Sequence, residues 1–355
     1  MVRQCQKEKF DMSVFNLSIY NSKNRLDNEI TIRESFQMKK GKSGGNSEIM
    51  IREPLSKRIR KDWSKNRGLY FLFIPVLVYY IIFHYGPMAG LLISFQNYKP
   101  IKGVFGSKWV GLKNYKDFFN SYYFWRVLRN TLKISVTNLI FSFPMPIILA
   151  LMINELRTKH FKKAVQTITY LPHFISIVVI MSMLSDLTSR NGAITTFLSH
   201  FGFEPVTMLQ EPQYFLPLYI ISGIWQNIGW NSIIYLSAII GIDAQLYEAA
   251  KIDGAGKLRQ LFSVTLPCLF PTIIIMFILQ MGKMFNVGHE KILLMYNPLT
   301  LEVADVINTY VYREGLLNMN WSYSAAVGMF NSVVSFLLVW GTNKFSKKLS
   351  GSGLW

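Results

Sequence analysis

The chain has 355 residues, and only 16% of them are charged, whereas soluble domains average about 25%. Half of the residues are hydrophobic (50%), and long runs contain almost no charge, which is typical of a polytopic membrane protein. The formal net charge is +18, but the basic residues gather in a tail and in short loops rather than on one folded face. Lysine and arginine beside anionic lipid account for this charge, so we do not expect nucleic acid as a partner.

Residues 1–66 are polar and basic and predict a cytoplasmic tail, with little fixed structure before about Met50. We recognise no signal peptide before the first apolar run, which is therefore expected to be an uncleaved anchor. Residues 51–63 read as a short basic lead into a membrane helix, so one hypothesis is that translation begins at Met50. A Gly-Lys-Ser sequence in the tail is not a phosphate loop, because Phe36 stands where the loop needs a glycine.

Six apolar runs follow, and the first is long enough at about 1.5 Å per residue to cross a bilayer core of about 30 Å with some tilt. Prolines occur inside several of them, and repeated kinks favour helices that line a pathway over a simple anchor bundle. The predicted fold is an all-α membrane protein, with a six-helix domain over residues 67–345. The predicted spans are Leu69–Phe95, Leu132–Ile153, Val165–Leu187, Tyr214–Gly241, Leu266–Val287 and Ser324–Trp340.

The charges near the spans predict the orientation. Six spans place both termini on one side, and basic residues near span ends mark the cytoplasmic side. The lead into the first span, the loop between spans two and three, and the tail 346–355 are basic and fall on one side, together with the loop 243–266. We therefore predict a multi-pass plasma-membrane protein with both termini in the cytoplasm. The first outer loop, 96–130, conflicts with this rule because it also carries several basic residues.

The fourth span is unusual because it contains polar and aromatic residues at helical spacing. Gln226, Asn227, Trp230, Asn231 and Tyr235 are separated by three and four positions, which places them on one broad face. Polar groups inside a span are costly, so they are candidates for contact with a substrate. The alternative is that they only bridge neighbouring helices.

A polar stretch, Tyr247–Pro271, separates spans four and five. It reads YEAAKIDGAGKLRQLFSVTLPCLFP and begins with good helix-forming residues. Asp253-Gly254 then predicts a helix end and a turn, because glycine tolerates positive φ. One interpretation is an ordinary amphipathic connector; the other is a helix that a protein outside the membrane recognises.

This stretch resembles the cytoplasmic coupling loop, or EAA loop, of binding-protein-dependent ABC importer permeases. Its Glu-Ala-Ala-x-x-Asp-Gly-Ala form is similar to the sugar-importing branch, closest to permeases for polysaccharide-derived oligosaccharides. A Gly-Leu-x-Asn-Tyr-x-x-Phe sequence, 111–118, also resembles an element that sugar-type permeases carry after their first helix. The resemblance implies the transmembrane architecture of a type I ABC importer.

The resemblance also assigns roles within the coupling loop. Glu248 would pair with a basic group on an ATPase, and Ala249 and Ala250 would keep the helix thin enough to enter a cleft. Asp253 would cap the helix or make a polar contact, and Gly254 would permit the turn. The positions matched to the motif are Glu248, Ala249, Ala250, Asp253, Gly254, Ala255, Leu266 and Pro267.

In sugar-type permeases the helices beside the coupling loop contact the substrate, which implies the same for spans four and five here. Aromatic faces beside amide groups suit sugar rings and hydroxyls. We place Lys283 inside span five, where it could meet the carboxylate of an acidic sugar; the alternative is that it extends toward the interface. The predicted pathway residues are Trp225, Gln226, Asn227, Trp230, Asn231, Tyr235, Gln280, Lys283 and Asn286.

We predict that the chain transports its substrate and does not itself catalyse the making or breaking of covalent bonds. The sequence shows no nucleophile elbow, and the two cysteines and five histidines are scattered without the spacing of a metal site. The resemblance implies a second permease subunit, a cytosolic ABC ATPase dimer that binds ATP and Mg, an extracellular solute-binding protein, a carbohydrate substrate and membrane lipid. This chain itself is expected to need no cofactor.

Three other functions remain open at this point. The first is a permease of the same superfamily for peptides or amino acids. The second is a secondary transporter driven by an ion gradient, for which Asp186 is the clear intramembrane carboxylate but no repeat is visible. The third is a membrane scaffold or receptor, for which we see no appended signalling domain.

Overall fold

The computed structural model describes residues 63, 65–351, 353 and 354. The predictions of a tail without fixed structure and of a start at Met50 concern residues outside this described part. The chain divides into two compact units, Met1–Tyr85 and Gly86–Trp355.

The described residues of the first unit form one helix. It consists of α4 (Arg67–Tyr80) and a π-helical segment, η1 (Ile81–Tyr85), and none of its side chains is buried. Most of these side chains are large and apolar, such as Phe71, which is 76% exposed. This is the surface expected of a helix that faces lipid.

The second unit begins with α5 (Gly86–Met88) and a 3-10 segment, η2 (Ala89–Phe95). The helix type thus changes near Gly86-Pro87, inside the first predicted span. A two-stranded antiparallel ribbon of β1 (Gln96–Asn97) and β2 (Lys108–Trp109) then encloses a short loop. Further segments complete the part of the chain before the third predicted span: η3 (Pro100–Lys102), α6 (Gly103–Gly106), α7 (Lys113–Phe119), α8 (Tyr123–Ser142) and α9 (Pro144–Glu155).

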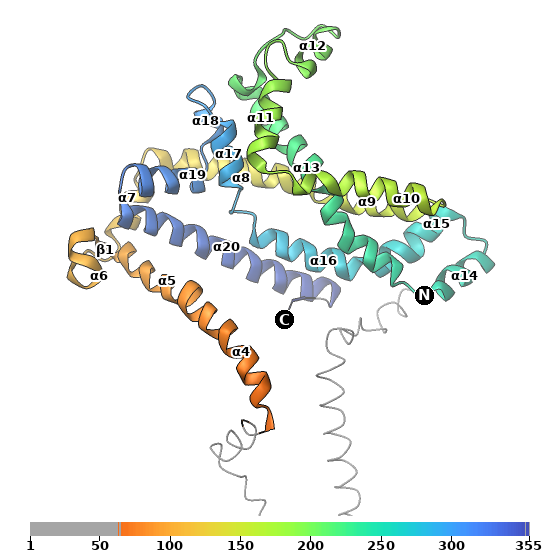
Figure 1. The fold of residues 1–355 in the computed structure, drawn as a ribbon, viewed down its shortest axis with the longest axis horizontal. Helices are drawn as coiled ribbons and strands as arrows, with labels where there is room; N and C mark the ends of the chain where they lie inside the picture. The colour runs from red at the N-terminus through yellow and green to blue at the C-terminus, as the bar shows by residue number, and fades with distance from the viewer. Residues whose placement is uncertain (1–62, 64, 352, 355) are drawn as a thin grey trace, which may run out of the picture. The chain divides into compact units, whose positions relative to one another are not determined.

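The third predicted span is the clearest departure from expectation. Instead of one helix over Val165–Leu187, the structure has α10 (Lys159–Tyr170), the 3-10 turn η4 (Leu171–Phe174) and α11 (Ile177–Leu187), with a bend of 98°. Pro172 lies in the turn, and its ring and missing N–H oppose a continuous helix. In Figure 1, α11 and the following α12 (Ala193–Ser199) extend away from α10.

Helix α13 (Pro212–Ile240) is the long central helix of the second unit, preceded by the short η5 (Met208–Gln210). It packs along α9 and crosses α10 at Gly229, where a Cβ atom would lie 2.0 Å from the backbone oxygen of Thr169. Only a glycine permits such a close approach between two helix backbones.

Substituting Gly229 with alanine will force α13 and α10 apart. We expect a cost of about 1–3 kcal/mol in the free energy of unfolding, the usual range for overpacking. Gly341 in the last helix is the matched control, because nothing lies within 4 Å of a Cβ built there. Thermal unfolding of the purified protein should show a lower midpoint for Gly229→Ala and no loss for Gly341→Ala; equal midpoints would contradict the close contact.

The chain then turns by 67° into α14 (Ala244–Ile252), followed by α15 (Lys257–Gln260), the π-helical η6 (Leu261–Thr265) and α16 (Leu266–Gly282). The segment between spans five and six forms several short helical pieces, and some of its apolar side chains are buried, including Ile292 and Ile307 at 0% exposure. The pieces are α17 (His289–Met295), α18 (Leu301–Ala304), α19 (Ile307–Tyr312) and η7 (Arg313–Leu317).

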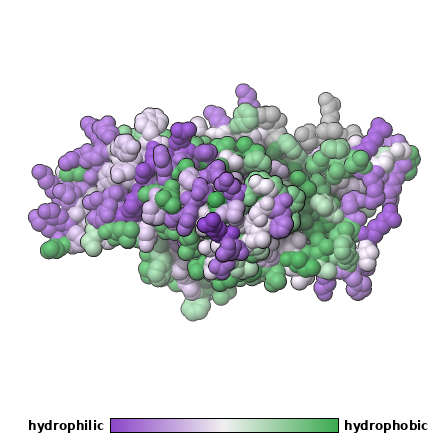
Figure 2. Space-filling model, turned by 90° about the horizontal axis from the view of Figure 1, so that it is seen from above, coloured by the Kyte–Doolittle hydropathy of each residue, from purple (hydrophilic) through white to green (hydrophobic). Residues whose placement is uncertain are grey.

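The last helix, α20 (Trp321–Ser350), continues into the predicted C-terminal tail. By length and composition, 4 helices among the described residues can cross a membrane, and 6 can if each of the two bent pairs counts as one span. On the face shown in Figure 2, hydrophilic residues cover much of the left half and the right edge of the view, and apolar residues are most abundant between the centre and the right.

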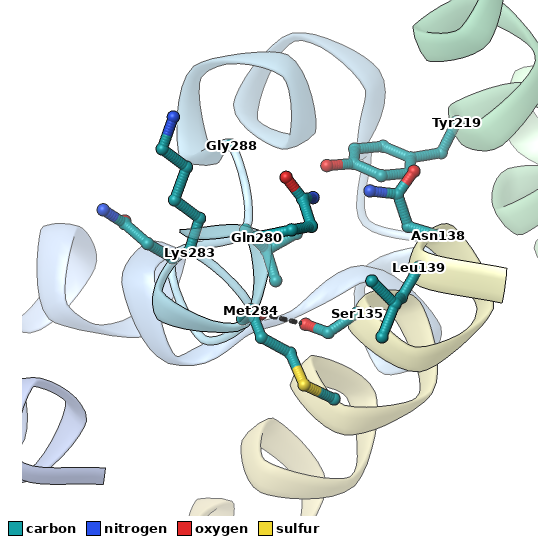
Figure 3. A pocket seen from close by; sticks show the side chains of 10 residues that line it. Ser135, Asn138, Leu139, Tyr219, Gln280, Lys283, Met284 and Gly288 are labelled. Atoms are coloured by element: carbon teal, nitrogen blue, oxygen red, sulfur yellow. Dashed lines mark hydrogen bonds between the residues drawn. The ribbon is translucent and has the colours of Figure 1, made fainter. Parts of the chain in front are cut away.

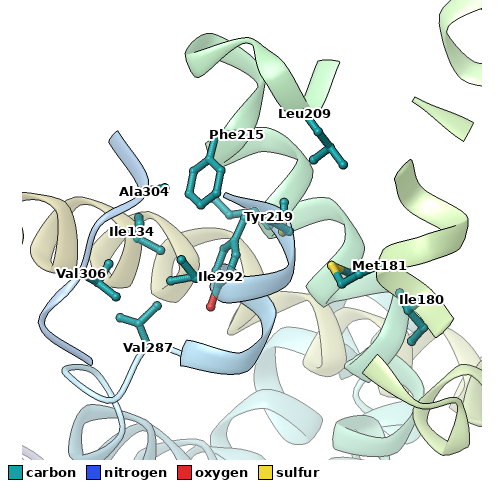
Figure 4. Packing of buried hydrophobic residues seen from close by; sticks show 12 residues of the cluster. Ile134, Ile180, Met181, Leu209, Phe215, Tyr219, Val287, Ile292, Ala304 and Val306 are labelled. Carbon is teal, nitrogen blue, oxygen red and sulfur yellow. The ribbon is translucent and has the colours of Figure 1, made fainter. Parts of the chain in front are cut away.

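Two buried clusters frame the middle of α13. Toward its start, Phe215 and Tyr219 pack with Ile292 of α17 (Figure 4). Toward its end, Leu236 packs with Ala150 of α9 and with residues of α16. The stretch of α13 between these clusters borders a cavity.

Candidate functional site

A cavity of about 400 Å³ with both polar and apolar walls lies between α13 and α16, with part of its wall from α8 and α9. Its volume falls within the usual range of about 300–1,000 Å³ for ligand pockets. One face of α13 supplies Tyr219, Gly223, Asn227, Asn231 and Tyr235, which follow one another at intervals of four. A helix rises about 24 Å over this length, so the polar wall is elongated and suits a chain-like ligand.

A smaller cavity of about 190 Å³ adjoins the first, because both share Asn138, Tyr219, Gln280 and Lys283 in their walls. Figure 3 shows the side chains of Asn138, Gln280 and Tyr219 pointing toward one another. Below them the Ser135 hydroxyl donates a hydrogen bond to the Met284 carbonyl. Amide and hydroxyl groups of this kind donate and accept hydrogen bonds without carrying charge, which suits hydroxyl groups of a ligand.

The structure brings most of the predicted pathway residues together. Six line the larger cavity, and Asn286 lines the smaller one with two of them. The other two predicted residues, Trp225 and Trp230, line neither cavity and are 47% and 43% exposed. The six are Gln226, Asn227, Asn231, Tyr235, Gln280 and Lys283.

Trp230 has another partner. Its ring stacks on His173 of the η4 turn with ring centroids 4.7 Å apart, and His173 Nδ1 lies 3.1 Å from the Asn227 side-chain oxygen. The tryptophan therefore packs against the break in the third span. Its position on the polar face of α13 did not indicate this role.

Lys283 does not lie inside a span as predicted. Helix α16 ends at Gly282, and Lys283 is its exposed C-cap residue. A lysine at the C-terminal end of a helix interacts favourably with the helix dipole. Lys283 still lines both cavities, from the end of α16 rather than from its middle.

Sequence reasoning missed Lys291, a buried cation in the wall of the larger cavity. It is 8% exposed, and its Nζ donates a 2.7 Å hydrogen bond to the Tyr219 carbonyl. The Nζ also lies 4.6 Å from the centre of the Tyr219 ring. Burial lowers the pKa of the Lys291 ammonium to about 7. Asn138 was also missed, although an amide inside an apolar run is a recognisable signal.

The helix-turn after α13 has well-defined ends. At its start the Asp243 carboxylate accepts a 3.0 Å hydrogen bond from the Gln245 N–H. At its end Gly254 has φ +74°, as predicted, and the N–H of Ala255 donates to the Ala250 carbonyl at 2.8 Å. With a second bond from the Gly254 N–H to the Lys251 carbonyl, this is the Schellman arrangement, which needs a left-handed residue.

The residues matched to the coupling motif differ in exposure. Glu248, Asp253 and Gly254 are exposed, whereas Ala250 is 4% exposed and packs inward. Ala249 is half-buried and so accessible beside Glu248. The remaining motif residues are half-buried: Ala255 follows the turn, and Leu266 and Pro267 begin α16.

Polar contacts hold the helix-turn against its surroundings. The Tyr247 hydroxyl lies 3.0 Å from the hydroxyl of Thr265, a buried residue at the end of η6, directly before α16. The Gln260 amide donates to the Ala255 carbonyl at 2.7 Å. Lys257 forms an exposed ion pair with Glu155 at the end of α9. Figure 1 accordingly shows α14 and α15 near the ends of α9 and α10.

A buried ion cluster ties the segment between spans five and six to α8. The Asp305 carboxylate is fully buried and accepts hydrogen bonds from Arg126 at 2.9 Å and from Arg313 at 2.7 and 3.1 Å. Thr309 donates a further bond at 3.0 Å. Burial alone would lower the pKa of Arg313, but the hydrogen bonds and charge of Asp305 raise it above its usual value.

The structure thus has apolar helices around a cavity lined by amides. An exposed helix-turn joins the two helices that form most of the cavity wall. Together these features define a multi-pass membrane transport subunit. Comparison with known proteins gives the family. Residues 142–351 match the model of the binding-protein-dependent transport system inner membrane component. The chain belongs to this family of permease subunits, which transport solutes and are not themselves catalytic.

Two relatives from Bacillus subtilis (strain 168) are each 41% identical to this chain. The polygalacturonan/rhamnogalacturonan transport system permease protein YteP aligns over 86% of this chain and 96% of its own length. Protein LplB aligns over 82% and 92%. A crystal structure of a bacterial ABC transporter involved in the import of the acidic polysaccharide alginate contains a chain with 41% identity and a TM-score of 0.77, covering 82% of this chain and 99% of that one.

Proposed function

We propose that this chain is a transmembrane subunit of an ATP-driven importer that takes up oligosaccharides by alternating access. The observation that carries the proposal is the position of the cavity. Its walls come mainly from α13 and α16, and the segment from α14 to η6 connects these two helices. A protein that moves this segment would therefore move both walls.

The proposed substrate is a fragment of an acidic polysaccharide. The relatives' names refer to polygalacturonan, rhamnogalacturonan and alginate. The amides of Asn138, Gln226 and Gln280 can bind sugar hydroxyls, and the larger cavity is elongated along α13. These features support a carbohydrate chain rather than a compact solute.

The proposed partners follow from the family. They are a second permease subunit, a cytosolic ABC ATPase dimer that binds ATP and Mg, an extracellular solute-binding protein and the surrounding lipid. A related chain occurs in an alginate transporter crystallised with an alginate pentasaccharide-bound periplasmic protein. In this proposal Glu248 and Ala249 contact the ATPase, while Asp253 and Gly254 shape the turn that presents them.

We propose that both termini and the α14 turn lie in the cytoplasm. The ion pair between Lys257 and Glu155 places the turn beside the loop that leads into α10. This loop and the start of α10 are basic, with Arg157, Lys159 and two further lysines, and such charge favours the cytoplasmic side.

The alternative functions have less support. An ion-driven carrier needs an ionisable carboxylate in its pathway, and none of the described residues lining the two cavities is acidic. Asp186 is exposed at the end of α11. A permease for peptides remains the second candidate, since a cavity with amides and a lysine could also bind a peptide carboxylate.

Purification and transport measurements test the proposal together. An affinity-tagged chain isolated from its native membrane should carry a second permease and an ABC ATPase, identified by mass spectrometry. After reconstitution into vesicles with the binding protein outside, oligosaccharide uptake should require internal ATP. Uptake driven by an ion gradient without ATP, or uptake of peptides but not sugars, would contradict the proposal.

A further inference from the structure

Lys291 is a buried amine without an anionic partner among the described residues. It lines the larger cavity, and none of the three ion pairs in the described part of the chain includes it. Its one hydrogen bond goes to the neutral Tyr219 carbonyl. Since an ammonium has three N–H donors, two remain for a ligand.

The surroundings of Lys291 hold the ammonium at the cavity wall. Its Nζ lies above the Tyr219 ring, 4.6 Å from the centre. A Cβ at position 223 would approach the Nζ to 3.1 Å, so Gly223 provides the room that the lysine occupies beside α13. A side chain fixed in this way loses little further freedom when a ligand binds.

An unpaired ammonium in a buried site is costly, and a hydrogen-bonded anion offsets this cost. None of the described residues lining the cavity can supply the anion. A carboxylate ligand can supply it, and it also favours the charged form of the lysine that burial disfavours. A neutral sugar would leave the ammonium unpaired.

We propose that Lys291 is the carboxylate-binding group of this cavity, where its ammonium pairs with a uronic acid unit of the transported oligosaccharide. This inference rests on the proposed function and adds the residue that selects the charge. Lys283 lines the same cavity from the end of α16, but it is exposed, so water screens its contribution.

The test measures oligosaccharide binding to the complex of permeases and ATPase. The solute-binding protein is left out, so that any preference for acid over ester arises in the cavity. The probes are trigalacturonate, trimannuronate and the methyl esters of both, because acid and ester differ in charge but hardly in shape. In Lys291→Met we expect the dissociation constant of the acid that the wild-type complex binds to rise about tenfold, the usual effect of losing one charge-assisted hydrogen bond. The constant of its ester should change less than twofold.

Two further variants serve as controls. Lys291→Arg keeps the charge and should recover part of the preference for acid over ester, whereas Lys283→Met should lower that preference less than Lys291→Met does. An equal loss of acid and ester binding in Lys291→Met would indicate a structural role and overturn the inference, as would unchanged acid binding. If neither of the two acids binds the wild-type complex while ATP-driven oligosaccharide uptake persists, the inference fails and the proposed function stands. If that uptake is absent as well, the proposed function fails.

Discussion

Replacing Gly254 with threonine will lower ATP-driven uptake by about thirtyfold while leaving membrane insertion intact. Gly254 has φ +74°, and a β-branched residue at positive φ costs about 2 kcal/mol, which corresponds to about thirtyfold in an equilibrium. A Cβ at this position meets nothing within 4 Å, so the effect comes from the backbone alone. The turn would relax and displace Glu248 and Ala249, so ATP hydrolysis should continue with less transport per ATP.

The chain offers a matched control two residues away. Gly256 has φ −66°, and nothing lies within 4 Å of its Cβ position either. Threonine is also acceptable there as a helix N-cap, so Gly256→Thr should transport normally. Gly254→Asn should retain most activity, because asparagine tolerates positive φ. Uptake by Gly254→Thr within twofold of wild type would contradict the importance of this turn.

The second large effect is expected for Asp305→Asn, which changes the charge but hardly the shape. The Asp305 carboxylate is fully buried and pairs with Arg126 and Arg313, whose side chains are 23% and 25% exposed. Removing one partner of a buried ion pair costs about 3 kcal/mol, because the remaining charge is left without compensation. Thermal unfolding of the purified complex should show a midpoint lower by roughly 5 °C or more.

An exposed ion pair provides the comparison for Asp305. Lys257 and Glu155 have side chains 65% and 58% exposed, and such pairs contribute under about 1 kcal/mol. Glu155→Gln should therefore shift the unfolding midpoint much less than Asp305→Asn does. Similar shifts for both variants would show that the buried cluster is not an important support for the segment between spans five and six.

Much of the architecture could be predicted because it follows from local patterns. Apolar runs of sufficient length identify spans without knowledge of their packing. The turn at Gly254 is equally local, since Asp-Gly after helix-forming residues predicts a glycine at positive φ. The spacing of Gln226, Asn227 and Asn231 placed all three in the cavity wall, because helical periodicity fixes a shared face.

Residues that depend on long-range packing could not be predicted. Lys291 and Asp305 are charged residues between spans five and six, and nothing in the local sequence shows that contacts with α13 and α8 bury them. The sequence predicted kinks at prolines within spans but not a bend as large as the 98° near Pro172, because neighbouring helices decide whether a proline kinks or breaks a span. Trp230 lies on the predicted face but stacks on His173 of that same break.

The hydroxyl contact between Tyr247 and Thr265, 3.0 Å long, has a mechanical consequence. This hydrogen bond connects the first turn of α14 to the residue directly before α16, so the residues between them form a closed loop. A closed loop resists bending, because deforming it breaks a hydrogen bond with one buried partner. When α14 is displaced, α16 therefore moves with it, because the connecting residues do not bend to take up the movement.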